Sequence, residues 1–373
     1  MSDLLVRGGR TATGDAVDVA IVDGVVVADS APGATTLDAT GLVVVPGLID
    51  LQVNGAAGID LTLEPHRLWE LAALLPEYGV TAFLPTVITS SPEARETALA
   101  TYRAGPPPGW AGAVPLGVHL EGPMIAPARK GAHPERWLRD PSAELVAGWS
   151  REAGVAMVTL APELPGALDV VERLVGRGVL VSVGHTAAPA DQVTAATDRG
   201  VRLVTHLGNA MPPIGAREPG AAGTALADRR LVAGVIADGH HLHPATLAVF
   251  WRALGPTRFL SVTDCTAALG LPDGPARLGD QHVEVRDGAV RLDDGTLAGS
   301  AASLSQCLRV LRETTGCTQA EAVTTCTATA AGLMGEDQRG RIEAGARGDL
   351  TLLDDRLDVV ATVVGGRVLH RRS

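Results

Sequence analysis

The chain has 373 residues, of which 46% are hydrophobic and 20% are charged, and its net charge at pH 7 is −11. This composition is typical of a globular protein with a substantial core and excludes a disordered chain. The negative charge argues against nucleic acid or an anionic membrane as the main partner. The longest apolar runs are only strand-sized, and the N-terminus lacks the pattern of a secretion signal. We therefore expect a cytoplasmic protein that is not embedded in a membrane.

Both ends of the chain predict small β units. In the first 45 residues, two apolar runs flank Asp23-Gly24, a strong signal for a two-residue hairpin turn. Residues 349–353 and 359–364 have the same character. Because neither end is large enough to fold alone, we expect residues 1–45 and 338–373 to pair in one small β-sandwich domain. A further hairpin, in residues 275–296, is a candidate for the same domain.

Residues 46–337 alternate between apolar runs and amphipathic segments. The apolar runs are nearly continuous in hydrophobicity, as parallel strands buried on both faces require, and they lie at 47–52, 82–86, 117–121, 157–161, 179–185, 201–206, 231–238 and 259–264. Helical patterns lie between or after them, at 66–78, 92–102, 142–152, 167–176, 190–199, 245–254, 302–315 and 318–333. This alternation predicts an α/β fold, a (β/α)8 TIM-like barrel. After the sixth run, the Gly/Pro-rich segment 208–223 predicts a long loop that serves a site.

Ligand-type side chains stand where these predicted strands end, which is where a barrel of this type carries its active site. Glu121, His185 and His206 offer one carboxylate and two imidazoles, a set that binds a divalent ion and leaves a position for water. Asp264 ends the eighth run, where a carboxylate can take a proton from that water. A single histidine is more commonly a hydrogen-bonded core residue, but four such groups at four strand ends indicate a site. His119 shares a strand face with Glu121 and is expected to support it.

The sequence predicts one metal ion per subunit. Lys130 is the only lysine, and it lies in a loop rather than at a strand end, so no residue suits a lysine-bridged pair of metals or a Schiff-base aldolase. The first strand run ends in Gln52-Val-Asn54, whose neutral amides are poor ligands for a second ion. Zinc is the first expectation for the single site, and iron, manganese and cobalt are also compatible with its ligands.

Nine short motifs, taken in their order and spacing, carry a resemblance to a known family. They include Pro46-Gly-Leu-Ile-Asp-Leu-Gln-Val-Asn-Gly55, His119-Leu-Glu-Gly-Pro123, Lys130-Gly-Ala-His133, Thr205-His-Leu-Gly-Asn-Ala-Met211 and Asp238-Gly-His-His241. The others are residues 184–186, 217–220, 262–264 and 297–300. Over nearly its whole length the chain resembles the N-acetylglucosamine-6-phosphate deacetylase family of the amidohydrolase superfamily.

The resemblance implies hydrolysis of the acetamido group of N-acetyl-D-glucosamine 6-phosphate, giving D-glucosamine 6-phosphate and acetate. It implies that Glu121, His185 and His206 hold the metal and that Asp264 is the catalytic acid and base. It also implies that His133 helps to stabilise the oxyanion. The implied substrate contacts are Ala132, His133, Asn209, Ala210, Arg217, His241, Leu297, Ala298 and Gly299, of which Arg217 and His241 meet the phosphate. A homodimer with the phosphate site near the subunit interface is implied as well.

Three other functions compete with this one. Another amino-sugar phosphate, such as N-acetylgalactosamine 6-phosphate, or a different amide could be the substrate, because a few contacts that the sequence does not place decide this choice. A catalytically inactive barrel scaffold is disfavoured because Glu121, His185, His206 and Asp264 are all present. An isomerase or aldolase barrel lacks the strand-end lysine.

Overall fold

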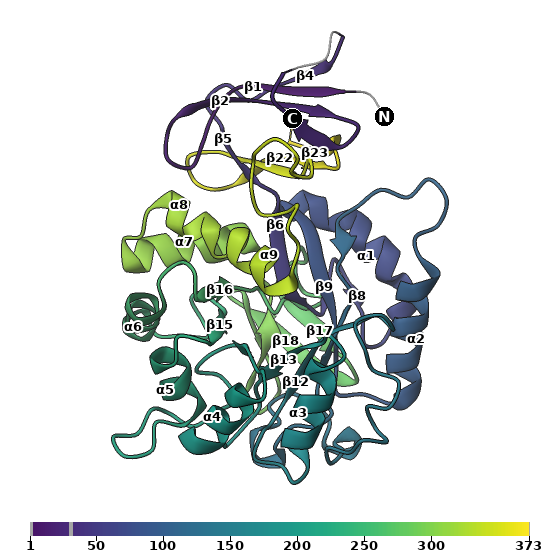
Figure 1. Ribbon diagram of the computed structural model, residues 1–373, viewed down its shortest axis with the longest axis vertical. Coiled ribbons are helices and arrows are strands. Elements are labelled where there is room, and N and C mark those ends of the chain that lie inside the picture. The colour runs from purple at the N-terminus through teal and green to yellow at the C-terminus, as the bar shows by residue number, and fades with distance from the viewer. Residues whose placement is uncertain (1–2, 30–32, 373) are drawn as a thin grey trace.

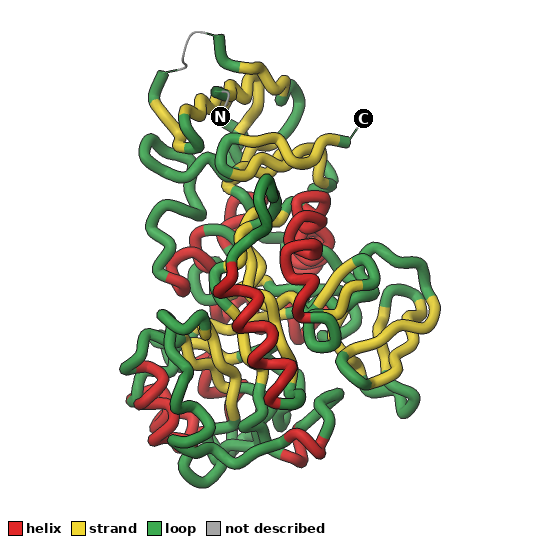
Figure 2. The backbone as a smooth tube through the Cα atoms, turned by 90° about the vertical axis from the view of Figure 1, so that its right-hand side faces the viewer, coloured by secondary structure: helices red, strands yellow, loops and turns green. Residues whose placement is uncertain are grey.

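The computed structural model describes residues 3–29 and 33–372. A β unit that contains both ends of the chain lies at one end of a larger barrel (Figures 1 and 2). In these described residues, no helix combines the length and the apolar character needed to cross a membrane.

The β unit is one mixed sheet of eight strands. Its strands are β1 (Leu4–Arg10), β2 (Ala16–Val22), β3 (Val25–Val27), β4 (Thr35–Asp38), β5 (Val43–Pro46), β21 (Leu350–Leu353), β22 (Val359–Val364) and β23 (Arg367–Arg371). The order is β23-β22-β21-β5-β1-β2-β3, and β4 pairs with β1. The two chain ends meet where β5 and β21 pair antiparallel. Apolar residues of both ends share one core, so the prediction that the termini form one β unit is confirmed.

The barrel consists of eight parallel strands in chain order. They are β6 (Leu48–Val53), β9 (Val80–Ile88), β11 (Val118–Glu121), β12 (Val155–Leu160), β13 (Leu180–Val183), β14 (Leu203–Val204), β15 (Val232–Val235) and β16 (Phe259–Ser261). Each coincides with one of the eight predicted runs. The first and last strands meet through a parallel bridge between Val53 and Cys265 and a hydrogen bond from Asn54 N to Cys265 O of 2.8 Å. Short strands β7 (Gly55–Ala56), β8 (Ile59–Asp60) and β10 (Val114–Pro115) accompany the barrel.

Helices surround the barrel (Figure 1). They are α1 (Leu68–Leu74), α2 (Pro92–Ala104), α3 (Ala167–Val175), α4 (Ala190–Asp198), α5 (Gly220–Ala227), α6 (Pro244–Leu254), α7 (Leu304–Thr315), α8 (Gln319–Thr324) and α9 (Ala328–Met334), with short 3-10 turns η1 (Pro65–Arg67), η2 (Leu75–Tyr78), η3 (Pro127–Arg129) and η4 (Glu135–Trp137). Local chemistry explains where several begin. For example, Ser303 caps α7 through Gln306 N, and Thr318 and Glu321 form a capping box at α8.

Two helix predictions were wrong in detail. Residues 142–152 form turns instead of a helix, because Ser142 and Ser150 accept hydrogen bonds from Leu145 N and Ala153 N and thereby stabilise local turns. The predicted helix 318–333 is broken between α8 and α9. At the break, the carbonyl oxygen of Cys326 accepts a hydrogen bond from Ile49 N of β6. In a continuous helix, this carbonyl would instead accept a hydrogen bond from within the helix.

The hairpin at 275–296 does not join the terminal sheet. It belongs to a separate four-stranded antiparallel sheet of β17 (Gly274–Leu278), β18 (Gln281–Arg286), β19 (Ala289–Arg291) and β20 (Leu297–Ser300). This sheet is an excursion from the end of the eighth barrel strand, since the chain leaves after Asp264 and returns where Ser300 N donates to Asp264 O. The terminal sheet instead contacts the starts of β6 and β9, so the two sheets lie at opposite ends of the barrel strands.

Candidate active site

A cavity of about 270 Å³ opens at the C-terminal ends of the barrel strands. It is lined by Glu121, His185, His206 and Asp264 and by predicted substrate contacts from three loops and strand β20, namely Ala132, His133, Asn209, Ala210, His241, Leu297, Ala298 and Gly299. The structure therefore brings together every predicted site residue except one. Arg217 does not line this cavity and is exposed in the loop that precedes α5.

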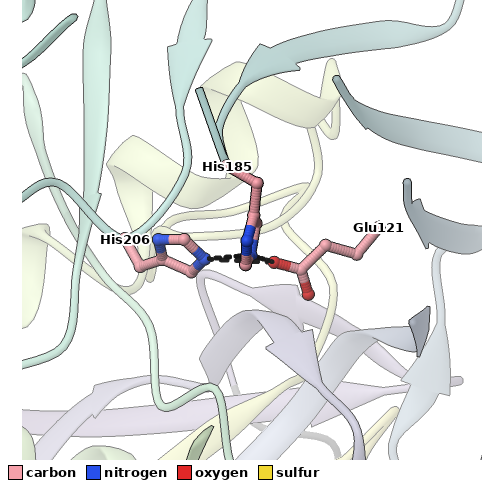
Figure 3. A group of neighbouring side chains, drawn as sticks. All are labelled: Glu121, His185 and His206. Carbon is pink, nitrogen blue, oxygen red and sulfur yellow. Dashed lines mark hydrogen bonds and ion pairs between the residues drawn. The ribbon is translucent and has the colours of Figure 1, made fainter. Parts of the chain in front are cut away.

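The predicted metal ligands converge on one point (Figure 3). Glu121 Oε1 lies 3.1 Å from His185 Nε2 and 3.1 Å from His206 Nε2, and the two imidazole nitrogens are 3.0 Å apart. All three side chains are buried. They come from the ends of β11, β13 and β14, so parallel strands alone bring together residues that are up to 85 positions apart.

The donor set fits a cation. His185 Nδ1 lies 2.8 Å from the carbonyl oxygen of Arg129, which can only accept, so Nδ1 carries the proton and Nε2 of the neutral ring presents a lone pair. That lone pair faces a carboxylate oxygen only 3.1 Å away, and two acceptors at this distance repel one another unless a cation lies between them. A divalent ion would satisfy all three at once.

The electrostatics of Glu121 agree with this arrangement. Burial acts to raise its pKa, but the facing imidazoles of His185 and His206 outweigh burial and hold the pKa of Glu121 well below its usual range. The side chain is therefore an ionised carboxylate in a buried position, which is costly unless a cation meets it.

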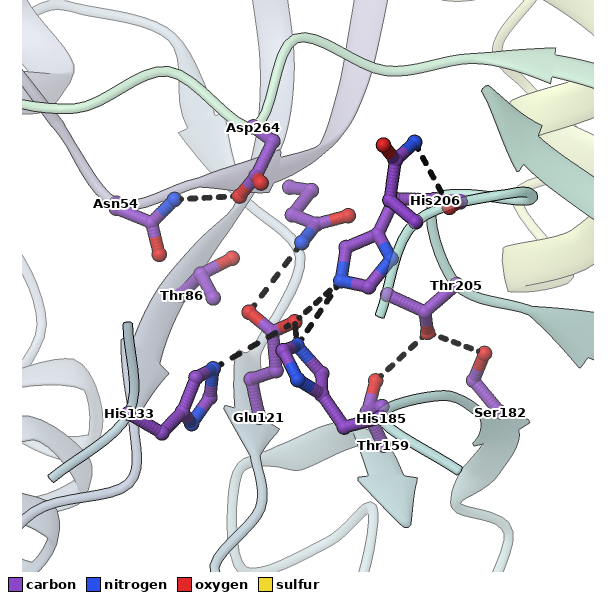
Figure 4. A network of polar contacts seen from close by, with 12 residues as sticks. Asn54, Thr86, Glu121, His133, Thr159, Ser182, His185, Thr205, His206 and Asp264 are labelled. Atoms are coloured by element: carbon purple, nitrogen blue, oxygen red, sulfur yellow. Dashed lines mark hydrogen bonds and ion pairs between the residues drawn. The ribbon is translucent and has the colours of Figure 1, made fainter. Parts of the chain in front are cut away.

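Asp264 stands beside this cluster and is held by an amide (Figure 4). Asn54 Nδ2 donates to Asp264 Oδ1 at 2.7 Å, and Gln52 Nε2 donates to Glu121 Oε2 at 3.3 Å. Burial, together with the negative charge of Glu121, raises the pKa of Asp264 to about 8. A carboxylate whose pKa lies near neutrality can both accept and return a proton during a reaction.

Several site residues have an unusual backbone conformation. Among the described residues, eight non-glycine residues have positive φ, and four of them line the cavity: His185 (49°), His206 (31°), Ala210 (51°) and Asp264 (52°). This left-handed region is sterically unfavourable for residues with a Cβ and persists where surrounding contacts enforce it. The chain therefore turns sharply after β13, β14 and β16, at the residues that present His185, His206 and Asp264 to the cavity.

His133 reaches the cavity from the loop that follows β11. Thr89 N donates to His133 Nδ1 at 3.3 Å, so Nδ1 is an acceptor and the proton of the neutral ring resides on Nε2. His133 Nε2 lies 4.0 Å from Glu121 Oε1. Burial, followed by the neighbouring His185, keeps the pKa of His133 well below its ordinary value, so it can act as a neutral N–H donor.

The remaining predicted contacts lie on two loops and on strand β20. Asn209 Nδ2 donates to His206 O at 3.2 Å, which fixes the loop after the sixth strand. His241 Nδ1 pairs with Asp238 Oδ2 at 2.7 Å. At Gly299, φ is 65° and an added Cβ would lie 2.7 Å from Asp264 O, so the backbone of β20 approaches the end of the eighth strand more closely than any other residue type would allow.

Sequence reasoning missed the roles of the first-strand amides and of a buried hydroxyl layer. Gln52 and Asn54 were noted only as neutral residues, yet each contacts one carboxylate of the site. Beside the site, His119 contacts Thr86 and Thr159. From Thr159, hydrogen bonds continue through Thr205 to Ser182 (Figure 4). His119 is therefore a buried polar link, and burial lowers its pKa to about 4. The available signal was the two-residue spacing of Gln52 and Asn54, which places both amides on the same face of the first strand.

Residues 43–369 match the sequence profile of the Amidohydrolase family. The chain belongs to this family, as both the barrel and the ligand set at its strand ends indicate.

Individual relatives narrow the comparison. The N-acetylglucosamine-6-phosphate deacetylase of Danio rerio is 38% identical over 90% of this chain and 86% of its own length. A solved structure of the N-acetylglucosamine-6-phosphate deacetylase from Thermotoga maritima superimposes with a TM-score of 0.88 and 32% identity, covering 99% of this chain and 100% of that chain. An N-acetylgalactosamine-6-phosphate deacetylase of Escherichia coli O157:H7 is 34% identical over 93% of both chains. The resemblance to N-acetylglucosamine-6-phosphate deacetylases is confirmed.

Proposed function

We propose that this protein hydrolyses the acetamido group of N-acetyl-D-glucosamine 6-phosphate to D-glucosamine 6-phosphate and acetate. The observation that carries the proposal is the convergence of Glu121, His185 and His206 beside Asp264 and His133 in one cavity. A cation site, a proton acceptor and a neutral N–H donor are the three elements that amide hydrolysis by water requires. The relatives named above act on this class of substrate.

Glu121, His185 and His206 would hold one divalent ion. When bound, such an ion supplies a Lewis acid that polarises the amide carbonyl and makes water a better nucleophile at neutral pH. Zinc is the first candidate, and iron, manganese and cobalt also suit two imidazoles and a carboxylate. The amides of Gln52 and Asn54 support a single ion, since their nitrogens already donate to the two carboxylates. Elemental analysis that finds two tightly held ions per chain would overturn this stoichiometry.

The protein's own side chains then move the protons. Asp264 takes a proton from the attacking water and returns it to the departing nitrogen, so that the amine leaves in neutral form. His133 donates its Nε2–H to the carbonyl oxygen as negative charge develops there. Asn54 keeps Asp264 oriented throughout, because its hydrogen bond reaches one carboxylate oxygen and leaves the other free for the proton.

The phosphate site is proposed to involve a second subunit. His241 lines the cavity, whereas Arg217 lies outside it on an exposed loop, next to the exposed apolar Ile214. An arginine that serves a neighbouring copy in a homodimer would have this position, and its planar guanidinium suits a phosphate. Mixing Asp264→Asn subunits with Arg217→Ala subunits tests this idea. Hybrids regain activity if Arg217 acts in the partner's site and stay inactive if it acts in its own.

Deacetylation of N-acetylgalactosamine 6-phosphate is the second candidate, because one relative of similar identity carries that name. The ratio of kcat/KM for the two competing substrates decides between them. A cytoplasmic location belongs to the proposal, since all four cysteines are buried free thiols, as expected in a reducing compartment.

The decisive experiment measures acetate release from N-acetylglucosamine 6-phosphate by wild type and by Asp264→Asn, each with and without chelator. We expect turnover by the wild type that chelation abolishes. We expect almost no turnover by the variant, although its metal content is normal. Turnover by Asp264→Asn at the wild-type rate would reject its role, and absence of acetate release by metal-loaded wild type would reject the function.

A further inference from the structure

The turn after the seventh barrel strand contains a carboxylate that the mechanism above does not use. Asp238 follows β15 and is 4% exposed, so it is buried although it carries a carboxyl group. Its Oδ1 accepts hydrogen bonds from the backbone N–H groups of His240 and His241, both at 2.9 Å. Gly239, between Asp238 and His240, has φ of 90°, which gives the turn its shape. Oδ1 of Asp238 thus stabilises the backbone of the turn.

The second oxygen of Asp238 fixes a side chain. Asp238 Oδ2 accepts from His241 Nδ1 at 2.7 Å, and the two side chains are only 2% and 4% exposed. A carboxylate can only accept when ionised, so the proton resides on Nδ1 and the opposite edge of the ring, with Nε2, is left for other partners. Burial acts against the charge of Asp238, but the contact with His241 outweighs it and the pKa of Asp238 is lowered. The carboxylate is therefore ionised at neutral pH.

His241 differs from the other imidazoles of the cavity. His133, His185 and His206 all lie within 4.0 Å of Glu121 Oε1, whereas no contact of that kind is found for His241 in the described chain. Among the described residues that line the cavity, none is a lysine or arginine. His241 is thus the imidazole of the described cavity lining whose outer nitrogen can face an anionic group outside the metal cluster.

We propose that Asp238 is a positioning residue for phosphate recognition: it holds His241 through Nδ1–H in the orientation in which Nε2, once protonated, donates to the phosphate of the substrate. This inference rests on the proposed function, because it concerns the phosphorylated end of that substrate. In the complex, His241 donates from both nitrogens, to the Asp238 carboxylate through Nδ1 and to the phosphate through Nε2. Asp238 itself does not touch the substrate.

Two variants separate positioning from recognition. Asp238→Asn keeps an oxygen for the backbone N–H groups but replaces the ionised partner of His241. His241→Asn places an amide nitrogen near the position of Nδ1, so it preserves the contact with Asp238 and removes the Nε2 donor. Asp228→Asn is the matched control, since Asp228 also accepts a backbone N–H, from Arg230, but is partly exposed and does not line the cavity. Circular dichroism and melting temperature verify that each variant folds.

The readout is selectivity for the phosphate, measured as kcat/KM for N-acetylglucosamine 6-phosphate divided by that for N-acetylglucosamine. We expect Asp238→Asn to lower this ratio by about tenfold or more, mainly through KM, because a charge-assisted hydrogen bond is weakened. The same substitution should add nothing in the His241→Asn background, because Asp238 acts through His241. Equal losses on both substrates, an unchanged ratio, or a further loss in the double variant would each overturn the proposal.

A second readout uses the wild-type protein, and a variant is needed only to assign the NMR signals of His241. In metal-loaded protein labelled with 15N-histidine, the nitrogen signals of His241 should respond to glucosamine 6-phosphate and not to glucosamine. Identical responses to both sugars, or none to either, would contradict the proposal. If wild type releases acetate from neither acetylated sugar, the proposed function fails, and this titration still judges the role of the Asp238–His241 pair.

Discussion

Replacing Asn54 by alanine tests how strongly the first barrel strand controls catalysis. The substitution removes the amide that donates to Asp264 Oδ1 at 2.7 Å inside a site where both residues are buried. A hydrogen bond to a charged group contributes about 1.5–3 kcal/mol. If that energy is expressed at the transition state, kcat falls by about 10- to 150-fold while KM changes little. The hydrogen bond also lowers the pKa of Asp264, so its loss should move the acidic limb of the rate profile to higher pH.

Replacing Gln52 by alanine is the matched comparison, because it removes the neighbouring amide from the other carboxylate. Gln52 donates to Glu121 Oε2, the oxygen that does not face the two imidazoles. Loss of such a supporting contact commonly weakens metal binding by about 10- to 100-fold. We therefore expect Gln52→Ala to lose activity at limiting metal and to regain most of its kcat when metal is added in excess.

The assay combines metal content, measured by elemental analysis after gel filtration, with kcat and KM at increasing metal concentration. Asn54→Ala should retain its metal and keep a low kcat at every metal concentration, whereas Gln52→Ala should lose metal and recover. The reasoning is refuted if excess metal restores Asn54→Ala to the wild-type rate, or if the two variants behave alike.

Asp50, Gly299 and the metal site each give one further prediction. Burial raises the pKa of Asp50 to about 7, so its protonated carboxyl stabilises the folded state fully below about pH 4, and this stabilisation is lost as the pH rises through 7. Between pH 4 and pH 8, the free energy of unfolding of Asp50→Asn should therefore rise relative to that of the wild type by up to about 4 kcal/mol. A difference in melting temperature that does not vary with pH would contradict this. Gly299→Ala should lower kcat because its Cβ would press on Asp264 O, while Gly295→Ala, at φ 86° with no atom within 4 Å, should cost only backbone strain; equal rates would count against the close approach. Chelation should lower the melting temperature together with activity, and added zinc should restore both; a melting temperature that chelator leaves unchanged would show that the ion does not stabilise the folded state.

The barrel could be predicted because its strands are buried on both faces. Such strands need apolar side chains at every position, so their hydrophobic runs are continuous and easy to locate. The helix prediction at 142–152 failed for a related reason. Val146 and Trp149, three positions apart, are both buried, but consecutive turns bury them as effectively as a helix would. Periodicity reports which residues face the core and does not by itself specify the backbone that carries them there.

The cluster at the strand ends could be predicted for a topological reason. Parallel strands of a closed barrel end on the same side, so Glu121, His185, His206 and Asp264 had to lie near one another once the strands were assigned. The hydrogen bonds of Gln52 and Asn54 could not be predicted in this way. They depend on how the first strand meets the last, and barrel closure leaves no local pattern in the sequence.

The terminal sheet contributes to the active site through this same strand. β5 of the sheet runs into β6 of the barrel with only Gly47 between them, and Gly47 N donates to Asp349 O beside β21. Thr351 of β21 donates to Gly79 O, at the start of the neighbouring barrel strand, at 2.7 Å. These contacts fix the position of β6 along its own axis. Because side chains alternate along a strand, a shift by one residue would turn Gln52 and Asn54 away from both carboxylates. The sheet built from the two chain ends therefore stabilises the register on which the geometry of the site depends.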